Sequence, residues 1–218
     1  MSKIDGRHGV RKGGPTGAAA AAEAHRAGLR ACLEAMDTNA VTVVAERLAR
    51  IAGAGGLLLI AGNGGSAATA SHMALDLSKG RPPGQQSLRV RTVSLPDTSP
   101  MLTAWANDEG YDRVFAEQIR TLARPGDAVV LLSVSGTSPN IVAAARAARA
   151  AGAIVVALTG ARGRGMRRLA NLAITVPSDD YRVVEDVHLA ISHMITAYLS
   201  DALTRAKTAA TTRSRRVR

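Results

Sequence analysis

The residues best suited to chemistry in this 218-residue chain are histidines and carboxylates that stand at helical spacing. His72 and Asp76 are four residues apart, so on a helix they project from one face. A carboxylate next to an imidazole can move protons to and from a bound substrate. The same spacing also suits an ordinary surface ion pair, and this segment alone leaves both interpretations open.

A second group of such residues lies near the C-terminus and comprises Glu185, Asp186, His188 and His193. On one helix Glu185 and His193 would differ by about 80° in direction and by roughly 12 Å along the axis, so they cannot easily hold one metal ion together. His188 and His193 would lie on divergent faces. Each histidine, taken alone, is also compatible with a core or helix residue whose polar atoms are satisfied by neighbours.

Two apolar runs each end in a turn of small, hydroxyl-rich residues that opens a helix. Residues 57–61 lead into Gly62-Asn63-Gly64-Gly65-Ser66, and residues 128–132 lead into Ser133-Val134-Ser135-Gly136-Thr137-Ser138. A continuous apolar run is typical of a strand that is buried on both faces. Backbone N–H groups and hydroxyls at the start of a helix can bind an anion. One such turn could be a tight connection only, but two of them favour a phosphorylated ligand.

The order of the elements predicts an α/β domain with a mostly parallel sheet flanked by helices. Ligands of such sheets bind beyond the carboxyl ends of the strands, which is where both turns lie. Asn107 and Asp108 follow a helical stretch and, by themselves, indicate a turn. The expected helices are 18–53 with a break at 37–39, 66–78, 99–105, 112–122, 139–151 and 183–203, and 162–169 is a short helix or loop. The expected strands are 57–61, 88–95, 128–132, 153–158 and 173–176, and 80–86 is a loop.

Composition and charge divide the chain into one domain, residues 17–204, and two basic tails of disordered composition, residues 1–16 and 205–218. The net charge is +11, of which the first tail carries +3 and the second +6. Because the domain itself is nearly neutral and aromatic residues are only 2% of the chain, nucleic acid is not expected as a partner. No apolar stretch is long enough to span a membrane, and no secretory signal is expected. The single cysteine, Cys32, suits a reducing cytoplasm.

These turns, together with His72, Asp76, Asn107-Asp108 and the segment from Glu185 to His193, resemble the sugar isomerase (SIS) domain, and within it the phosphoheptose isomerases. The resemblance runs from about residue 20 to residue 203. It implies a flavodoxin-like three-layer sandwich with a five-stranded parallel sheet and an N-terminal helical extension. It also implies a homotetramer with active sites shared between subunits, and isomerisation of sedoheptulose 7-phosphate to a mannoheptose 7-phosphate without a nucleotide cofactor.

The resemblance also implies a role for each matched residue. Asp76 and His193 take the positions of the family's base and its acid/base histidine. Some members bind zinc at the equivalents of four residues, so zinc or another divalent metal is expected at His72, Asp76, Glu185 and His193. The residues expected to bind the substrate are Asn63, Gly64, Gly65, Ser66, Asn107, Asp108, Ser133, Val134, Ser135, Ser138 and Glu185, with the serines of the second turn on the phosphate.

Three residues depart from the family pattern. Asp76 replaces a glutamate, Glu185 replaces a glutamine, and Val134 replaces a threonine. The first two changes are compatible with stronger metal binding and equally with a different sugar phosphate as the substrate. The distance between Glu185 and His193 along their helix favours a site completed across subunits, or a Glu185 that bends from the helix start. The alternative to an enzyme is a non-catalytic SIS protein that senses sugar phosphates or associates with a replication initiator.

Overall fold

The computed structural model describes residues 16–80 and 89–216. Most of the expected N-terminal tail, residues 1–16, and most of the expected loop 80–86 therefore lie outside the described residues. Five parallel strands form one sheet in the order β2-β1-β3-β4-β5, which confirms the predicted fold class. The strands are β1 (Leu58–Ala61), β2 (Thr92–Ser94), β3 (Ala128–Ser133), β4 (Ile154–Thr159) and β5 (Leu172–Thr175).

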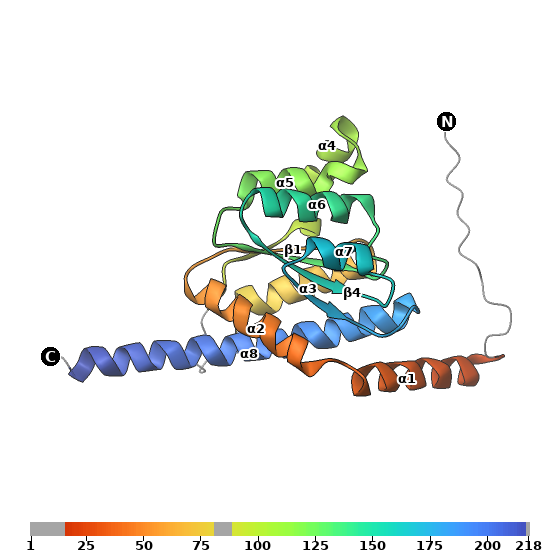
Figure 1. Cartoon of the computed structure of the whole chain (residues 1–218), viewed down its shortest axis with the longest axis horizontal. Helices are drawn as coiled ribbons and strands as arrows, with labels where there is room; N and C mark the ends of the chain where they lie inside the picture. Colours follow the sequence, from red (N-terminus) through yellow and green to blue (C-terminus); the bar gives the residue numbers. More distant parts are fainter. Residues whose placement is uncertain (1–15, 81–88, 217–218) are drawn as a thin grey trace.

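Helices cover both faces of this sheet (Figure 1). Because side chains alternate along a strand, Leu58 and Ile60 of β1 pack into one core while Leu59 and Ala61 pack into the other. The first core is closed by α2 (Thr38–Gly53), α3 (Gly65–Lys79) and α8 (Tyr181–Arg216). The helices of the second face are α4 (Ser99–Asp108), α5 (Val114–Leu122), α6 (Pro139–Ala150) and α7 (Arg164–Leu169), with short 3₁₀ turns at Leu95–Asp97 and Tyr111–Arg113.

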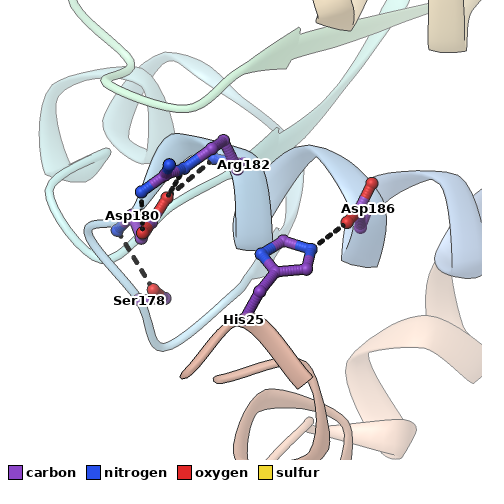
Figure 2. Close-up of polar contacts among 5 residues, drawn as sticks. All are labelled: His25, Ser178, Asp180, Arg182 and Asp186. Carbon is purple, nitrogen blue, oxygen red and sulfur yellow. Dashed lines mark hydrogen bonds and ion pairs between the residues drawn. The ribbon is translucent and has the colours of Figure 1, made fainter. Parts of the chain in front are cut away.

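The N-terminal extension is formed by α1 (Ala18–Glu34), which lies along the start of α8 (Figure 1). Among its residues Cys32 alone is buried. Figure 2 shows its polar contact with α8, a hydrogen bond of 2.8 Å between His25 Nε2 and Asp186 Oδ2. The break predicted at 37–39 is confirmed, because the Asp37 carboxylate accepts the backbone N–H of Ala40 and begins α2.

The last helix begins and ends differently from the prediction of 183–203. Asp180 begins it by accepting the backbone N–H of Arg182, as Figure 2 shows. Leu203 is the last residue of α8 that is described as buried, but the helix continues to Arg216. Residues 205–216, expected to be part of a disordered tail, are therefore helical, and the alanine, lysine and arginine residues among them have high intrinsic helix propensity. Within the described residues, no helix is long and apolar enough to cross a membrane.

Candidate functional site

The two hydroxyl-rich turns lie side by side at the carboxyl edge of the sheet. They follow β1 and β3, which are neighbours in register from Leu58 opposite Ala128 to Ala61 opposite Leu131. Two hydrogen bonds join Asn63 of the first turn to Asn140, the second residue of α6, which follows the second turn: Asn63 Nδ2 donates to Asn140 Oδ1 at 2.9 Å, and Asn140 Nδ2 donates to Asn63 Oδ1 at 2.8 Å. Polar groups from both turns can therefore contact one ligand.

The second turn connects β3 to α6 and is shaped by its own serines. The Ser133 hydroxyl is buried and accepts the N–H of Gly136 at 3.1 Å. The Ser135 hydroxyl is exposed and accepts the N–H of Thr137 at 3.3 Å. Gly136 has a φ of +64°, and a Cβ there would lie 2.8 Å from the Cα of Gly163, so the close approach of the next loop requires glycine. The result is a compact turn at the start of a helix, suited to an anion.

The first turn leads into α3 and brings Glu185 to the start of that helix. A Cβ at Gly65 would lie 2.3 Å from Glu185 Oε2, so the carboxyl group packs directly on this glycine. Burial raises the pKa of Glu185 above its ordinary value, the main chain of Ser66 opposes this, and the nearby charge of Asp186 adds to the rise. Glu185 thus contributes an acceptor to the first turn.

Two further side chains, Asn140 and Tyr111, contact the site and were missed by the sequence analysis. Asn140 is 1% exposed, and the Tyr111 hydroxyl donates to Asn63 Oδ1 at 3.1 Å. One sequence feature could have identified Asn140 as a site residue: it is the second residue of a helix that follows a serine-rich turn. Asn107 and Asp108 are exposed at the end of α4, where Asn107 Nδ2 donates to Asp108 Oδ1 at 2.8 Å.

The packing of α8 on α3 brings together His72, Asp76 and His193. The Nε2 atoms of the two histidines are 3.2 Å apart. Asp76 Oδ2 lies 3.6 Å from His72 Nε2 and 3.7 Å from His193 Nε2. The side chains of Asp76, His72 and His193 are 34%, 44% and 51% exposed. A carboxylate and two imidazoles at these distances can exchange protons with a substrate or ligate a metal ion.

Glu185 is not part of this cluster. Among the described residues, the group with ligand atoms within 4.8 Å of one another comprises His72, Asp76 and His193. The structure therefore brings together three of the four expected metal ligands in one chain and places the fourth at the first turn. His72 and Asp76 lie about 9–15 Å along α3 from that turn, which is close to the length of a sugar phosphate.

His188 points into the core instead. It is 0% exposed, and neither of its ring nitrogens has a hydrogen-bond partner of normal geometry among the described residues. Burial lowers the pKa of His188 to about 4, and the main chain of Thr159 opposes this in part. His188 is therefore a neutral residue of the core at the pH of a cell.

Comparison with known proteins identifies relatives of this arrangement. A model of the SIS domain matches residues 22–160. The chain is 39% identical to a phosphoheptose isomerase from Roseiflexus, over 71% of this chain and 78% of that protein. It is 41% identical to a phosphoheptose isomerase from Bradyrhizobium, over 82% of this chain and 92% of that protein. The structure of a phosphoheptose isomerase from Neisseria gonorrhoeae is 28% identical, with a TM-score of 0.75 over 83% of this chain and 95% of that one.

Proposed function

Because this chain belongs to the SIS domain family, and within it to the phosphoheptose isomerases, we propose that it converts sedoheptulose 7-phosphate to D-glycero-D-manno-heptose 7-phosphate. The reaction is an aldose–ketose isomerisation through an enediol. The observation that carries the proposal is that α3 begins at the first of the two neighbouring turns and leads to the cluster of His72, Asp76 and His193. The reaction moves protons without net oxidation, so it needs no nucleotide cofactor.

The substrate is placed with its phosphate at the second turn and its carbonyl end at the cluster. Hydrogen bonds to a charged group contribute about 1.5–3 kcal/mol each, so a turn with several donors can supply much of the binding free energy. In this proposal the phosphate is bound by Ser133, the backbone at Val134, Ser135 and Ser138. The sugar is bound by Asn63, Gly64, Gly65, Ser66, Asn107, Asp108 and Glu185.

Asp76 and His193 carry the proposed chemistry. The Asp76 carboxylate removes the proton from the carbon next to the carbonyl group, and His193 moves a proton between the two neighbouring oxygens. An imidazole exchanges its proton near neutral pH when unperturbed, which suits this second step. The distance of 3.7 Å between Asp76 Oδ2 and His193 Nε2 allows both groups to reach adjacent atoms of one substrate.

The cluster also fits zinc or another divalent metal. With bonds of about 2.0–2.2 Å, the ligand atoms of tetrahedral zinc lie about 3.3–3.6 Å apart. The three distances of 3.2, 3.6 and 3.7 Å in the cluster are close to this geometry. Two imidazoles and one carboxylate are a donor set that catalytic zinc uses with one position left for substrate. When bound, the metal would polarise the sugar's carbonyl and hydroxyl oxygens.

A homotetramer with shared active sites is part of the proposal. The half-exposed cluster is what a site completed by a second subunit would present in a single chain. Leu33 on α1, Leu75 on α3 and Met194 on α8 are also exposed, as residues at an interface would be in a single chain. Light scattering should give the mass of a tetramer at micromolar concentration. A stable monomer would contradict both the oligomer and the shared site.

We place the reaction in the cytoplasm. Cys32 has no second cysteine in this sequence with which to form a disulfide, so the chain does not depend on an oxidising compartment for an internal crosslink.

The direct test of the function is turnover. The purified protein should convert sedoheptulose 7-phosphate to an aldoheptose 7-phosphate, followed by the NMR signal of the aldose C1 proton. Binding of the sugar phosphate without turnover, in the presence of added zinc, would instead support the non-catalytic alternative. The curated relatives named above, all of them phosphoheptose isomerases, do not favour that alternative.

A further inference from the structure

A closed set of hydrogen bonds surrounds the side chain of Asn63, the first polar residue after β1. Asn63 and Asn140 exchange two bonds, of 2.9 and 2.8 Å, through their amide groups. The Tyr111 hydroxyl donates a third bond, of 3.1 Å, to Asn63 Oδ1. Asn140 is 1% exposed whereas Tyr111 is 58% exposed, so the set reaches from the core to the surface of the site.

These bonds leave Asn63 with one kind of free group. An amide oxygen has two lone pairs, and here one accepts from Asn140 and the other from Tyr111. The amide nitrogen has two hydrogens, of which Asn140 Oδ1 accepts one. Among the described residues, what remains without a partner is a single N–H on a half-buried side chain beside the second turn.

We propose that Asn140 and Tyr111 are positioning residues that hold Asn63 so that it presents an N–H donor, and no acceptor, to an oxygen of the bound sugar phosphate. The inference rests on the proposed function for the class of ligand. Asn140 orients the amide from the core side, and Tyr111 occupies the lone pair that would otherwise compete for the ligand's hydroxyl hydrogens. The ligand oxygen at this point must accept a hydrogen bond, as a carbonyl, a phosphate oxygen or a hydroxyl can.

The same bonds also tie the first turn to α6, which is a structural role. Both roles act through Asn63, so under either one the effect of Tyr111→Phe on ligand affinity should depend on the Asn63 side chain. The structural role predicts that Tyr111→Phe lowers the melting temperature together with ligand affinity. The positioning role predicts that it lowers ligand affinity and leaves the melting temperature unchanged.

The experiment uses a heptitol 7-phosphate, which is made by reducing the carbonyl group of sedoheptulose 7-phosphate. Because this compound has no carbonyl group, the enzyme cannot isomerise it. Calorimetry measures its dissociation constant for the wild type, Tyr111→Phe, Asn63→Ala and the double variant. Tyr111→Phe removes one hydroxyl from an exposed residue, so folding is not at risk. It should weaken binding about three- to tenfold in the wild type, as expected for one hydrogen bond, and have almost no effect in Asn63→Ala.

A second variant tests the buried partner. In Asn140→Asp the ionised carboxylate can accept from Asn63 but cannot donate to its oxygen, whereas the protonated carboxyl can do both. The affinity of Asn140→Asp for the heptitol phosphate, compared with that of the wild type at the same pH, should therefore be reduced at about pH 8 and recover as the pH is lowered to about 5. Asn140→Leu, which can do neither, should show no recovery.

Three results would overturn the inference: unchanged affinity in Asn63→Ala, equal effects of Tyr111→Phe in both backgrounds, or a pH dependence of Asn140→Asp that Asn140→Leu shares. A failure of the proposed function is seen separately, because the wild type would then not turn over sedoheptulose 7-phosphate, whether or not it binds the heptitol phosphate.

Discussion

Asp76 is the residue on which the proposed proton abstraction depends. Asp76→Asn keeps the shape of the side chain and removes its basicity, so turnover should fall by about 10²–10⁴-fold, the usual contribution of a general base. Binding of the heptitol phosphate should stay nearly intact, because the phosphate is bound at the second turn. Steady-state kinetics and calorimetry on the same samples check both parts.

Metal analysis of these samples separates the two roles that Asp76 and His193 can have. If they mainly ligate metal, Asp76→Asn and His193→Ala should also remove zinc from the protein. Asp186→Asn is the matched control, since Asp186 is bonded to His25 and lies outside the cluster. Near-normal turnover in both Asp76→Asn and His193→Ala would refute the proposed mechanism.

His188 should make the folded protein sensitive to acid. The pKa of His188 is about 4 in the folded protein and near 6.5 in the unfolded protein. Between pH 4 and pH 6.5 the unfolded state therefore binds a proton at this residue more readily than the folded state does. This contribution to stability is complete above about pH 6.5 and is lost as the pH falls towards 4, on the order of 3 kcal/mol in total. Urea unfolding of the wild type at pH 7 and 4.5 should show the loss.

His188→Leu is the comparison for this prediction. Leucine has a similar volume and no ring nitrogen left without a partner, so this variant should lose less stability over the same pH interval. Glu185 and the other titrating groups are common to both proteins, so their effects cancel in the difference. Equal losses in the two proteins would show that His188 is not the group responsible.

At the scale of elements, the turn between β3 and α6 should supply most of the affinity for phosphate. Replacing both Ser133 and Ser135 with alanine removes two hydroxyls and the bonds that shape the turn. Affinity for the heptitol phosphate should fall at least about tenfold, since each hydrogen bond to a charged group contributes about 1.5–3 kcal/mol. Thr103→Ala, on the exposed side of α4, is the control. Unchanged calorimetric affinity in the double variant would contradict the assignment.

The elements themselves were largely predictable from the sequence. Buried parallel strands such as β3 read as continuous apolar runs, and the break between α1 and α2 is marked by the capping residue Asp37. The end of α8 was predicted wrongly because the apolar periodicity stops at Leu203, whereas the intrinsic helix propensity of the following residues does not.

The site was predictable only in part. The spacing of His72 and Asp76 places them together within one helix, and the resemblance supplied His193. The contact between Asn63 and Asn140 joins residues 77 positions apart and follows from the pairing of β1 with β3, which no local pattern encodes. The position of Glu185 against Gly65 likewise depends on how α8 packs on α3.

At the scale of the whole molecule, we propose that residues 17–204 are the working domain. Leu203 is the last residue of α8 that is described as buried, so removing residues 205–218 exposes no described part of the core. A chain of residues 17–204 should keep the wild-type kcat and KM for sedoheptulose 7-phosphate. A large loss of activity with an unchanged melting temperature would assign a function to one of the basic ends.

The central claim is that this molecule isomerises a heptose phosphate by moving a proton through an enediol. The most direct measurement is turnover of sedoheptulose 7-phosphate by the full chain in D₂O, followed by NMR. The account predicts an aldoheptose 7-phosphate that carries deuterium at carbon 2, because the proton removed by Asp76 exchanges with solvent before it is returned. No aldose, or an aldose formed without any deuterium at carbon 2, would contradict it.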